Sequence, residues 1–266
     1  MKRFKRTETY EVSLVIKDDH FINPPKVAQR NAVINRALKE FCADLNALNE
    51  QTKNFVPGET SANDFIGFAE REQAQLSEQE IMEDWQIPLM EAMAKAITRG
   101  GGDILEVGFG RGVSADMIQK YPIDSHTIIE CNDHVIDEFF NPWKAKYTDK
   151  DIRLVHGLWQ DTINDLGRYD GILFHTYPLN EDEYMQYVHA SITFAEHFFS
   201  YATEHLKLGG SFTYFSNEIH SLSREHQHLL LKHFSSFNVS VVPLKMPKDV
   251  KDTWWADSMV VIEAIK

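Results

Sequence analysis

The chain has 266 residues, 43% of them hydrophobic, and a formal net charge of −13 at pH 7. A chain of this size can bury one substantial core, and its acidic charge disfavours nucleic acid and anionic membranes as partners, because phosphates attract Lys and Arg. The two cysteines, Cys42 and Cys131, are too few for a disulfide scaffold or a zinc cage, so we expect a cytoplasmic protein without a metal.

The first 75 residues are expected to form an extension, and residues 76–266 the main domain. Residues 2–6 are mostly basic, but no apolar stretch follows, so we expect neither a signal peptide nor a membrane-spanning helix. Residues 10–16 predict a short strand, and apolar residues at helical spacing from Val27 to Leu48 predict a helix. The extension is expected to form either a lid over a site or the interface of a homodimer.

A second helix is predicted at the start of the main domain. Ser77 and Glu80 make a capping box, in which each side chain satisfies a backbone N–H of the other end, and apolar residues follow at helical spacing as far as Ile97. Pro88 lies inside this pattern. Because proline lacks an N–H, it should bend the helix or end its first segment.

Short apolar runs then alternate with helical segments. Strands are predicted at Ile104–Val107, Ile128–Glu130, Arg153–His156, Gly171–Phe174 and Phe212–Phe215. This alternation predicts an α/β fold with a doubly wound, mostly parallel sheet and helices on both faces. Residues 206–215 predict a helix end, a glycine C-cap and a strand. Two final runs, Val239–Leu244 and Ser258–Ile265, predict a reversed strand inserted beside the last parallel one.

The first predicted strand runs into a glycine-rich turn at Gly108, Gly110 and Gly112, and Glu130 ends the next strand. Glycines let backbone approach a ligand closely, and a carboxylate about 20 residues later can accept ribose hydroxyls, so the pattern predicts a nucleotide pocket. Glu106, ahead of the glycines, would repel a phosphate. It suits a cationic cofactor without phosphate, such as S-adenosylmethionine.

Five segments that follow one another along the chain resemble successive motifs of the guanidinoacetate N-methyltransferase family. They are Trp85–Met90, Leu105–Gly110, Ile129–Asp133, Gly157–Asp161 and Asp170–Leu179. The resemblance covers about half of the chain, from residue 80 to residue 215. It implies the Rossmann-like sheet of class I methyltransferases and S-adenosylmethionine as cofactor or sole substrate.

The resemblance also implies how the cofactor is held. Met90 would pack on the adenosyl group, the three glycines would admit the methionine moiety, Glu130 would hold the ribose, and Leu158 with Asp161 would flank the adenine. Glu106, Asn132, Trp159 and His175 complete the predicted cofactor set. Two of these have ordinary alternatives, because a methionine such as Met90 is often a core residue and Asp161 could cap a helix.

The acceptor side departs from the family. Members grip the guanidinium of their substrate with a Glu and an Asp, and this chain has Gln86 and His175 at those positions. Because a guanidinium needs carboxylate partners, we expect a small-molecule substrate other than guanidinoacetate. His175 is expected to act as a general base or to donate a hydrogen bond, and Tyr177 to lay its ring on the sulfonium or merely to pack.

Other late aromatic and histidine side chains are less informative. Trp254 and Trp255 are expected to close the acceptor pocket or to cover the sheet edge. The histidines of the late helical segment, His220, His226, His228 and His233, lack metal-ligand spacing and are expected on a solvated helix.

Three functions are consistent with this pattern. The first is methyl transfer from S-adenosylmethionine to an amine-type small molecule. The second is cyclisation of the cofactor itself, in which its own amine attacks the γ-carbon to give azetidine-2-carboxylate and methylthioadenosine in natural-product biosynthesis. The third is cofactor binding without turnover.

Overall fold

The computed structural model describes Lys39 and residues 75–189, 191–246 and 256–266. The chain divides into two units at residue 64, and apart from Lys39 everything described here belongs to the second, Phe65–Lys266. The strand predicted at residues 10–16 and the tryptophans at 254 and 255 lie outside the described residues. So does the helix predicted from Val27 to Leu48, except for Lys39. The expected boundary after residue 75 therefore stays a prediction.

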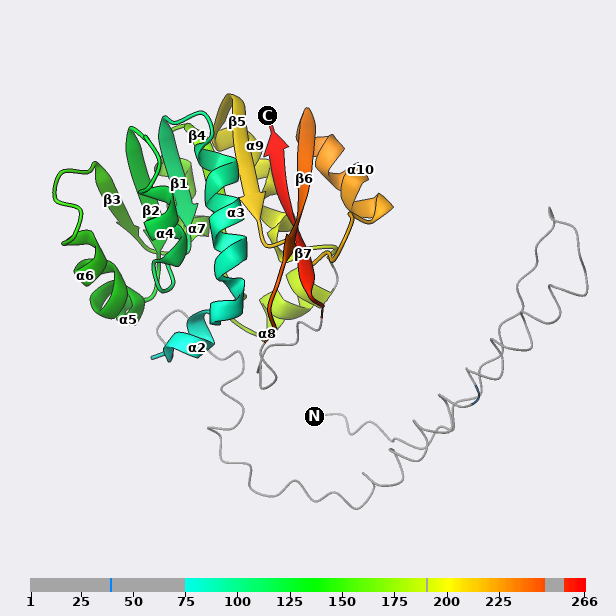
Figure 1. Ribbon diagram of the computed structural model, residues 1–266, viewed down its shortest axis with the longest axis horizontal. Coiled ribbons are helices and arrows are strands. Elements are labelled where there is room, and N and C mark those ends of the chain that lie inside the picture. The colour runs from blue at the N-terminus through cyan, green and yellow to red at the C-terminus, as the bar shows by residue number, and fades with distance from the viewer. Residues whose placement is uncertain (1–38, 40–74, 190, 247–255) are drawn as a thin grey trace, which may run out of the picture. The chain divides into compact units, whose positions relative to one another are not determined.

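In the described part of the chain, seven strands form one sheet in the order β3-β2-β1-β4-β5-β7-β6. Their bounds are β1 Asp103–Val107, β2 Ser125–Glu130, β3 Ile152–His156, β4 Tyr169–Phe174, β5 Leu206–Tyr214, β6 Ser236–Pro243 and β7 Ser258–Ile265. The first five are parallel, and β7 runs antiparallel between β5 and β6 (Figure 1). The predicted doubly wound sheet with an inserted reversed strand is confirmed.

The strand order reverses at β1, which pairs with β2 on one side and β4 on the other. Chain connections leave such a point in opposite directions, so a crevice opens beyond the carboxyl ends of the strands. The residues that follow β1, β2 and β4 therefore meet at one edge of the sheet.

Helices cover both faces of the sheet (Figure 1). In chain order the helical elements are α2 Glu78–Ile81, η2 Asp84–Gln86, α3 Ile87–Thr98, α4 Val113–Ile118, α5 Asp133–Val135, η3 Ile136–Phe140, α6 Asn141–Lys144, α7 Trp159–Thr162, η4 Ile163–Asp165, α8 Glu181–Glu183, η5 Tyr184–His189, η6 Phe194–Phe198, α9 Phe199–His205 and α10 Arg224–His233. On one face α3 packs Leu89 and Met93 against the sheet, and on the other Phe199 of α9 contacts Phe212 of β5. Burial of these apolar faces on both sides holds the sheet in place.

The predicted capping box is present at Ser77 and Glu80. The helix it opens ends at Ile81, and a new helix, α3, begins at Ile87 with Pro88 in its first turn. A proline in the first turn costs no hydrogen bond, because the N–H groups there have no partner within the helix. The single helix predicted from Ser77 to Ile97 is therefore divided into two, and Pro88 lies at the start of the second rather than at a bend or at the end of the first.

The glycine C-cap predicted after residue 206 is wrong. Helix α9 ends at His205, and β5 begins at once with Leu206 as the extended C-cap residue. Gly209, with φ of 77°, lies inside the strand where its pairing with β4 jumps from Tyr169–Leu206 to Gly171–Ser211. The glycine therefore allows a bulge in the strand, a feature that depends on the neighbouring strand.

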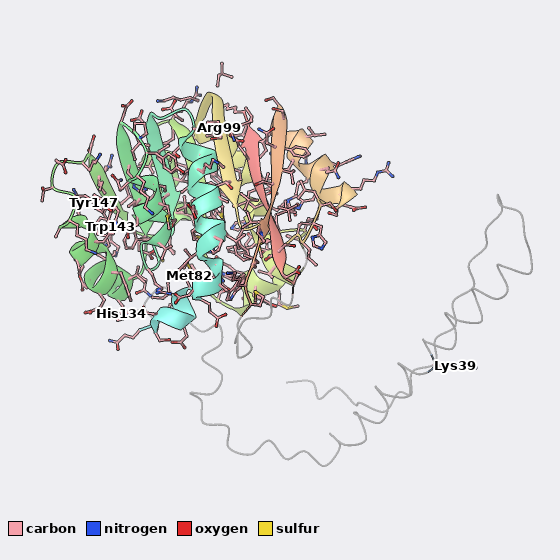
Figure 2. All side chains as sticks on the ribbon, in the orientation of Figure 1. Lys39, Met82, Arg99, His134, Trp143 and Tyr147 are labelled. Carbon is pink, nitrogen blue, oxygen red and sulfur yellow. The ribbon has the colours of Figure 1, made fainter. Side chains whose placement is uncertain are left out.

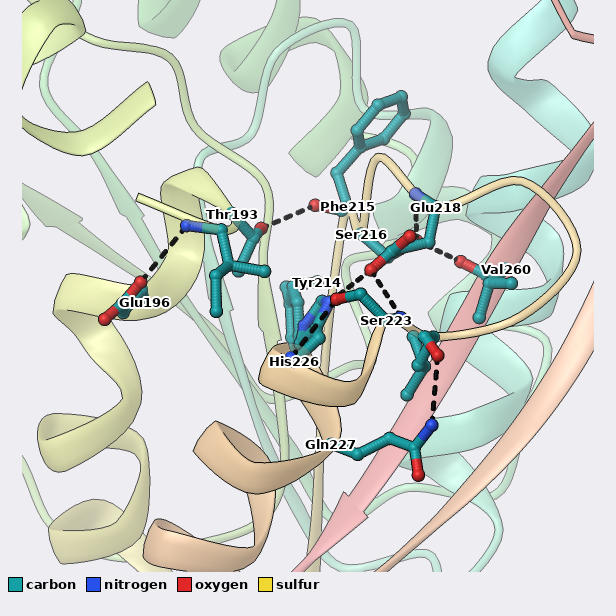
Figure 3. Close-up of polar contacts among 12 residues, drawn as sticks. Thr193, Glu196, Tyr214, Phe215, Ser216, Glu218, Ser223, His226, Gln227 and Val260 are labelled. Atoms are coloured by element: carbon teal, nitrogen blue, oxygen red, sulfur yellow. Dashed lines mark hydrogen bonds and ion pairs between the residues drawn. The ribbon is translucent and has the colours of Figure 1, made fainter. Parts of the chain in front are cut away.

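The expectation of a solvated late helix is wrong at His226. Its side chain is fully buried on the inner side of α10, where Nε2 is 2.5 Å from the Tyr214 hydroxyl and Nδ1 is 3.2 Å from a Glu218 oxygen (Figure 3). Burial lowers the pKa of His226, partly offset by Glu218. A buried imidazole needs partners at both nitrogens, and here both are supplied.

Candidate functional site

Two adjoining cavities lie at the carboxyl edge of the sheet. The first, of about 140 Å³, is lined by the residues that follow β1, β2 and β4 together with α2. The second, of about 180 Å³, lies beside η2 and the residues that follow β4 and β5. Four residues line both cavities: His175, Thr176, Tyr177 and Phe194. The segment after β4 thus forms the boundary at which a ligand in one cavity would face a ligand in the other.

The glycine-rich turn forms one side of the first cavity through Gly108 and Gly110. Gly108 has a φ of 89°, and a Cβ there would come within 2.4 Å of the carbonyl oxygen of His175. Gly112 does not line the cavity; a Cβ on it would clash at 2.7 Å with the ring of Phe109. The glycines therefore allow the turn to pack tightly against the end of β4 and upon itself.

Glu130 ends β2 with its side chain in the wall of the first cavity, and the residue is only 8% exposed. Its carboxylate accepts backbone N–H bonds from Phe109 at 2.9 Å, Cys131 at 2.9 Å and Asn132 at 3.0 Å. These bonds tie the end of β2 to the glycine-rich turn across the crevice. The side chain is consequently held in one orientation before any ligand arrives.

Glu106 lies behind the cavity wall. It is fully buried in β1, accepts a hydrogen bond from the Ser114 hydroxyl, and has one oxygen 3.0 Å from Nε2 of His126, although these two atoms are not aligned as a hydrogen bond. Ser114 itself lines the cavity. Glu106 would therefore act on the charge of a ligand from behind Ser114, without touching the ligand.

The other predicted cofactor residues divide into two groups. Asn132, Leu158 and Trp159 line the first cavity, and the Trp159 ring is fixed edge-on against Phe174 and Phe198. Met90 is fully buried in the core beneath α3, and Asp161 is an exposed residue in the first turn of α7; neither lines a cavity. Their predicted adenosyl and adenine contacts stay predictions.

The second cavity brings together the three residues predicted for catalysis, Gln86, His175 and Tyr177. Most of its other side chains are aromatic or apolar, namely Trp85, Phe174, Pro178, Tyr184, Val188, Phe194, Ala195 and Phe215. Among the described lining residues there is no carboxylate. A cation in this part of the cavity would face rings and amides.

His175 lies in the wall between the cavities, with its ring stacked on Phe215 at 5.4 Å between centroids. Removal from bulk water lowers the pKa of His175 to about 4, even though the ring keeps some contact with the cavities. The imidazole is therefore neutral near pH 7, and one ring nitrogen is free of a proton.

Sequence reasoning missed the loop that follows β5. Phe215 and Asn217 line the second cavity, and Asn217 has a φ of 58°, unusual for a residue other than glycine. Its neighbours are anchored on both sides: the Ser216 hydroxyl donates to the Val260 carbonyl, and Glu218 accepts from the Ser223 N–H (Figure 3). Sequence carries no signal for this arrangement, because one of the anchoring partners, Val260 of β7, lies 44 residues away along the chain.

Sequence reasoning also missed Arg111 and the α2 residues Glu80 and Ile81, which line the first cavity. Arg111 stands inside the glycine-rich turn, where the motif drew attention only to the glycines. In the described residues no group of three His, Cys, Asp or Glu side chains is placed to hold a metal ion. None of the described helices is long and apolar enough to span a membrane.

Several known proteins are similar to this chain in sequence. The chain is 29% identical over 107 residues to protein arginine N-methyltransferase 2 of Candida glabrata, and 29% identical over 108 residues to that of Saccharomyces cerevisiae. Each match covers 36% of this chain but only 25% and 26% of those relatives, so the chain matches about a quarter of their length.

Two solved structures are also similar. Precorrin-6y C5,15-methyltransferase of Geobacter metallireducens has 16% identity and a TM-score of 0.46, over 66% of this chain and 87% of that one. Spermidine synthase of Thermotoga maritima has 13% identity and a TM-score of 0.47, over 68% and 59% of the two chains.

The decisive match is to a family model. The model described as guanidinoacetate N-methyltransferase matches residues 61–240, which include the glycine-rich turn, Glu130 and the segment between the two cavities. The chain therefore belongs to the guanidinoacetate N-methyltransferase family, with the class I fold of S-adenosylmethionine-dependent methyltransferases.

Proposed function

We propose that this chain transfers a methyl group from S-adenosylmethionine to an amine-type small molecule other than guanidinoacetate. The observation that carries the proposal is the pair of adjoining cavities, which share four lining residues. One holds the glycine-rich turn and Glu130, and the other holds Gln86 and Tyr177, with His175 in the wall between them. A donor and an acceptor placed in the two cavities would meet at this wall, and such proximity is the main catalytic effect available here.

The residues of the first cavity fit the cofactor. A carboxylate has about four acceptor positions, and backbone N–H groups use three of those on Glu130, so one remains for a ribose hydroxyl. Leu158 and Trp159 offer apolar surface for a base. When bound, S-adenosylmethionine supplies a methyl group activated by its sulfonium. The chain's own residues then have to orient the partners and exclude water.

The second cavity argues against a guanidinium acceptor. At the positions where the family is expected to carry carboxylates, Gln86 is a buried neutral amide and His175 a neutral imidazole. Leaving a desolvated cation without its carboxylate partners costs several kcal/mol. The same reasoning applies to an arginine side chain of a protein, which is the acceptor named for the arginine N-methyltransferase relatives. We therefore expect an acceptor that enters uncharged.

The roles of individual side chains follow from their positions. Tyr177 lines both cavities, and its ring face would stabilise a positive charge at their junction. His175 offers an unprotonated nitrogen that can accept a hydrogen bond from an amine. Because its pKa is about 4, it is a weak base near pH 7, and orienting the nucleophile is the role we assign to it.

A second candidate function follows from the same observation, that the described residues lining the second cavity include no carboxylate. If no cationic acceptor is recruited, the amine of S-adenosylmethionine itself could be the nucleophile. Its nitrogen would form a bond to the γ-carbon, the carbon–sulfur bond would break, and methylthioadenosine would leave with the bonding electrons. The amine proton would pass to solvent, and azetidine-2-carboxylate would result.

One assay separates these functions. The purified full chain is incubated with S-adenosylmethionine alone, and then with guanidinoacetate, an arginine peptide or a panel of small amines. If S-adenosylhomocysteine forms only when an amine that can enter the cavity uncharged is added, methyl transfer is supported. If methylthioadenosine forms without any acceptor, cyclisation is supported. Methylation of guanidinoacetate would overturn the charge argument. Calorimetric binding without any product would leave only a cofactor-binding protein.

A further inference from the structure

Arg111 is the one cation that the glycine-rich turn carries, and it makes three contacts with the segment ahead of α3. Its Nη1 donates to the Met82 carbonyl oxygen at 2.8 Å and lies 2.8 Å from Asp84 Oδ1, and its Nη2 lies 3.2 Å from Glu78 Oε2. The Arg111 side chain is 19% exposed, whereas those of Glu78 and Asp84 are 60% and 76% exposed. The Arg111 side chain is thus more buried than the two carboxylates that it pairs with.

The segment it holds, Leu76–Asp84, covers the first cavity and is called the cover segment below. Leu76, Glu80, Ile81 and Met82 all line that cavity. Figure 1 shows α2, the centre of the cover segment, at the edge of the sheet to which the arrowhead of β5 points. A cofactor that enters the cavity from this side has to pass the cover segment.

Apart from Arg111, the cover segment is held mainly by apolar packing, because Met82 is 6% exposed and belongs to the core cluster of Trp85 and Leu89. At its start, Nε2 of His134 lies 3.2 Å from the Leu76 carbonyl oxygen. In its middle, Ile81 packs over the turn so closely that a Cβ on Gly110 would lie 3.2 Å from its Cγ2. Arg111 contributes two ion pairs and a charge-assisted bond to a carbonyl, and bonds of that kind are stronger than neutral ones.

We infer that Arg111 is a positioning residue that latches the cover segment over the bound cofactor and thereby sets how long the cofactor stays. This inference rests on the proposed function, because it takes the first cavity to be the S-adenosylmethionine site. Opening of the cover segment breaks the contacts of one side chain with Glu78, Met82 and Asp84. The latch therefore acts on dissociation of the ligand more than on its intrinsic contacts with the cavity.

The charge of Arg111 decides which ligand tests the latch. Arg111 lines the cavity, so its replacement also removes a positive charge near the sulfonium of S-adenosylmethionine. S-adenosylhomocysteine has no sulfonium, so its dissociation is free of that repulsion, and a variant that keeps Arg111 but changes its partners is also free of any effect on the ligand's carboxylate. S-adenosylhomocysteine is also not consumed during the measurement.

The test compares dissociation rates of S-adenosylhomocysteine from the full chain, measured by displacement with excess unlabelled ligand. Arg111→Gln should raise the rate about tenfold, which corresponds to about 1.4 kcal/mol. The double variant Glu78→Gln with Asp84→Asn keeps the turn intact and should raise it about threefold, because exposed ion pairs are weak and the carbonyl bond remains. Amide exchange should accelerate at residues 78–82 in both variants.

The matched control is Arg99→Gln. Arg99 is an exposed arginine that also makes an ion pair, 3.1 Å from the buried Glu263, but it lies at the opposite edge of the sheet from Met82 (Figure 2). Its replacement should leave the dissociation rate unchanged.

The outcomes are distinguishable. A rate within twofold of the wild type in both variants overturns the latch and leaves the proposed function intact. If Arg111→Gln fails to fold, the Glu78 and Asp84 double variant decides alone. A wild-type chain that binds neither S-adenosylmethionine nor S-adenosylhomocysteine overturns the proposed function, and the latch with it.

Discussion

Replacement of Glu130 should weaken both the fold and cofactor binding, because one carboxylate serves both. In the ligand-free protein it accepts the N–H groups of Phe109, Cys131 and Asn132 at 2.9 to 3.0 Å. Hydrogen bonds to a charged group contribute about 1.5–3 kcal/mol each when no other partner is available. The cavity adjoins this site, so water can replace part of the loss. We therefore expect Glu130→Ala to lower the free energy of unfolding by about 2–4 kcal/mol.

The effect on binding should be separate and similar in size. Loss of the acceptor for the ribose hydroxyls should weaken S-adenosylhomocysteine by about 1–3 kcal/mol, or about 5-fold to 150-fold in Kd. Glu130→Gln should fall between wild type and alanine, because its amide NH₂ faces backbone N–H donors at one of the two oxygen positions.

Urea denaturation of the ligand-free variants and calorimetric titration with S-adenosylhomocysteine provide the two measurements. Glu138→Ala, at an exposed position of η3, is the control and should change neither. If Glu130→Ala binds S-adenosylhomocysteine with wild-type affinity while remaining folded, Glu130 is not part of the cofactor site. If its unfolding free energy is unchanged, the three N–H bonds contribute nothing net and the reasoning from geometry is refuted.

Three further predictions concern the wall between the cavities. Tyr177→Phe should keep most activity and Tyr177→Ala should lose about 5-fold to 30-fold, since a ring face over a desolvated cation contributes about 1–2 kcal/mol; equal losses in a product assay would assign the effect to the hydroxyl. The double variant Gln86→Glu with His175→Asp should gain binding of guanidinoacetate, and calorimetry that detects none would contradict the charge argument. Burial lowers the pKa of His175 from 6.5 to about 4, so between these pH values the unfolded chain binds a proton that the folded chain does not. The contribution of His175 to folding stability is therefore complete above pH 6.5 and declines as the pH falls towards 4. It amounts to about 3 kcal/mol at most, and urea midpoints for wild type and His175→Gln that fall in parallel across this range would show that His175 does not cause the decline.

Much of the sheet could be predicted from local patterns. The run Ile104–Val107 and the final run Ser258–Ile265 are apolar and bounded by turn residues, and they became β1 and β7 within one residue of the expected bounds. The start of β5 could not be predicted in this way. Gly209 suits a helix end as well as a bulge, and only its pairing with β4 decides between the two.

The candidate site shows the same division. Gly108, Gly110 and Glu130 could be found from the sequence, because ligands in such sheets bind where the strands end and these residues follow β1 and β2 directly. Met90 could not be assigned by pattern alone, since a methionine at helical spacing fits both a core and a cavity, and α3 turns it into the core. Asn217 and Arg111 carry no local signal of their roles.

The sequence alone therefore determined the alternating architecture, the inserted reversed strand and the strand ends that hold the glycine-rich turn and Glu130, because these depend on periodicity and on residues close together in the chain. Only the tertiary structure decided that His226 is buried, that Glu106 lies behind the wall, that His175 divides two cavities and that Arg111 holds the cover segment. Each of these depends on a partner many residues away, and burial and pairing energies arise only when distant elements pack together.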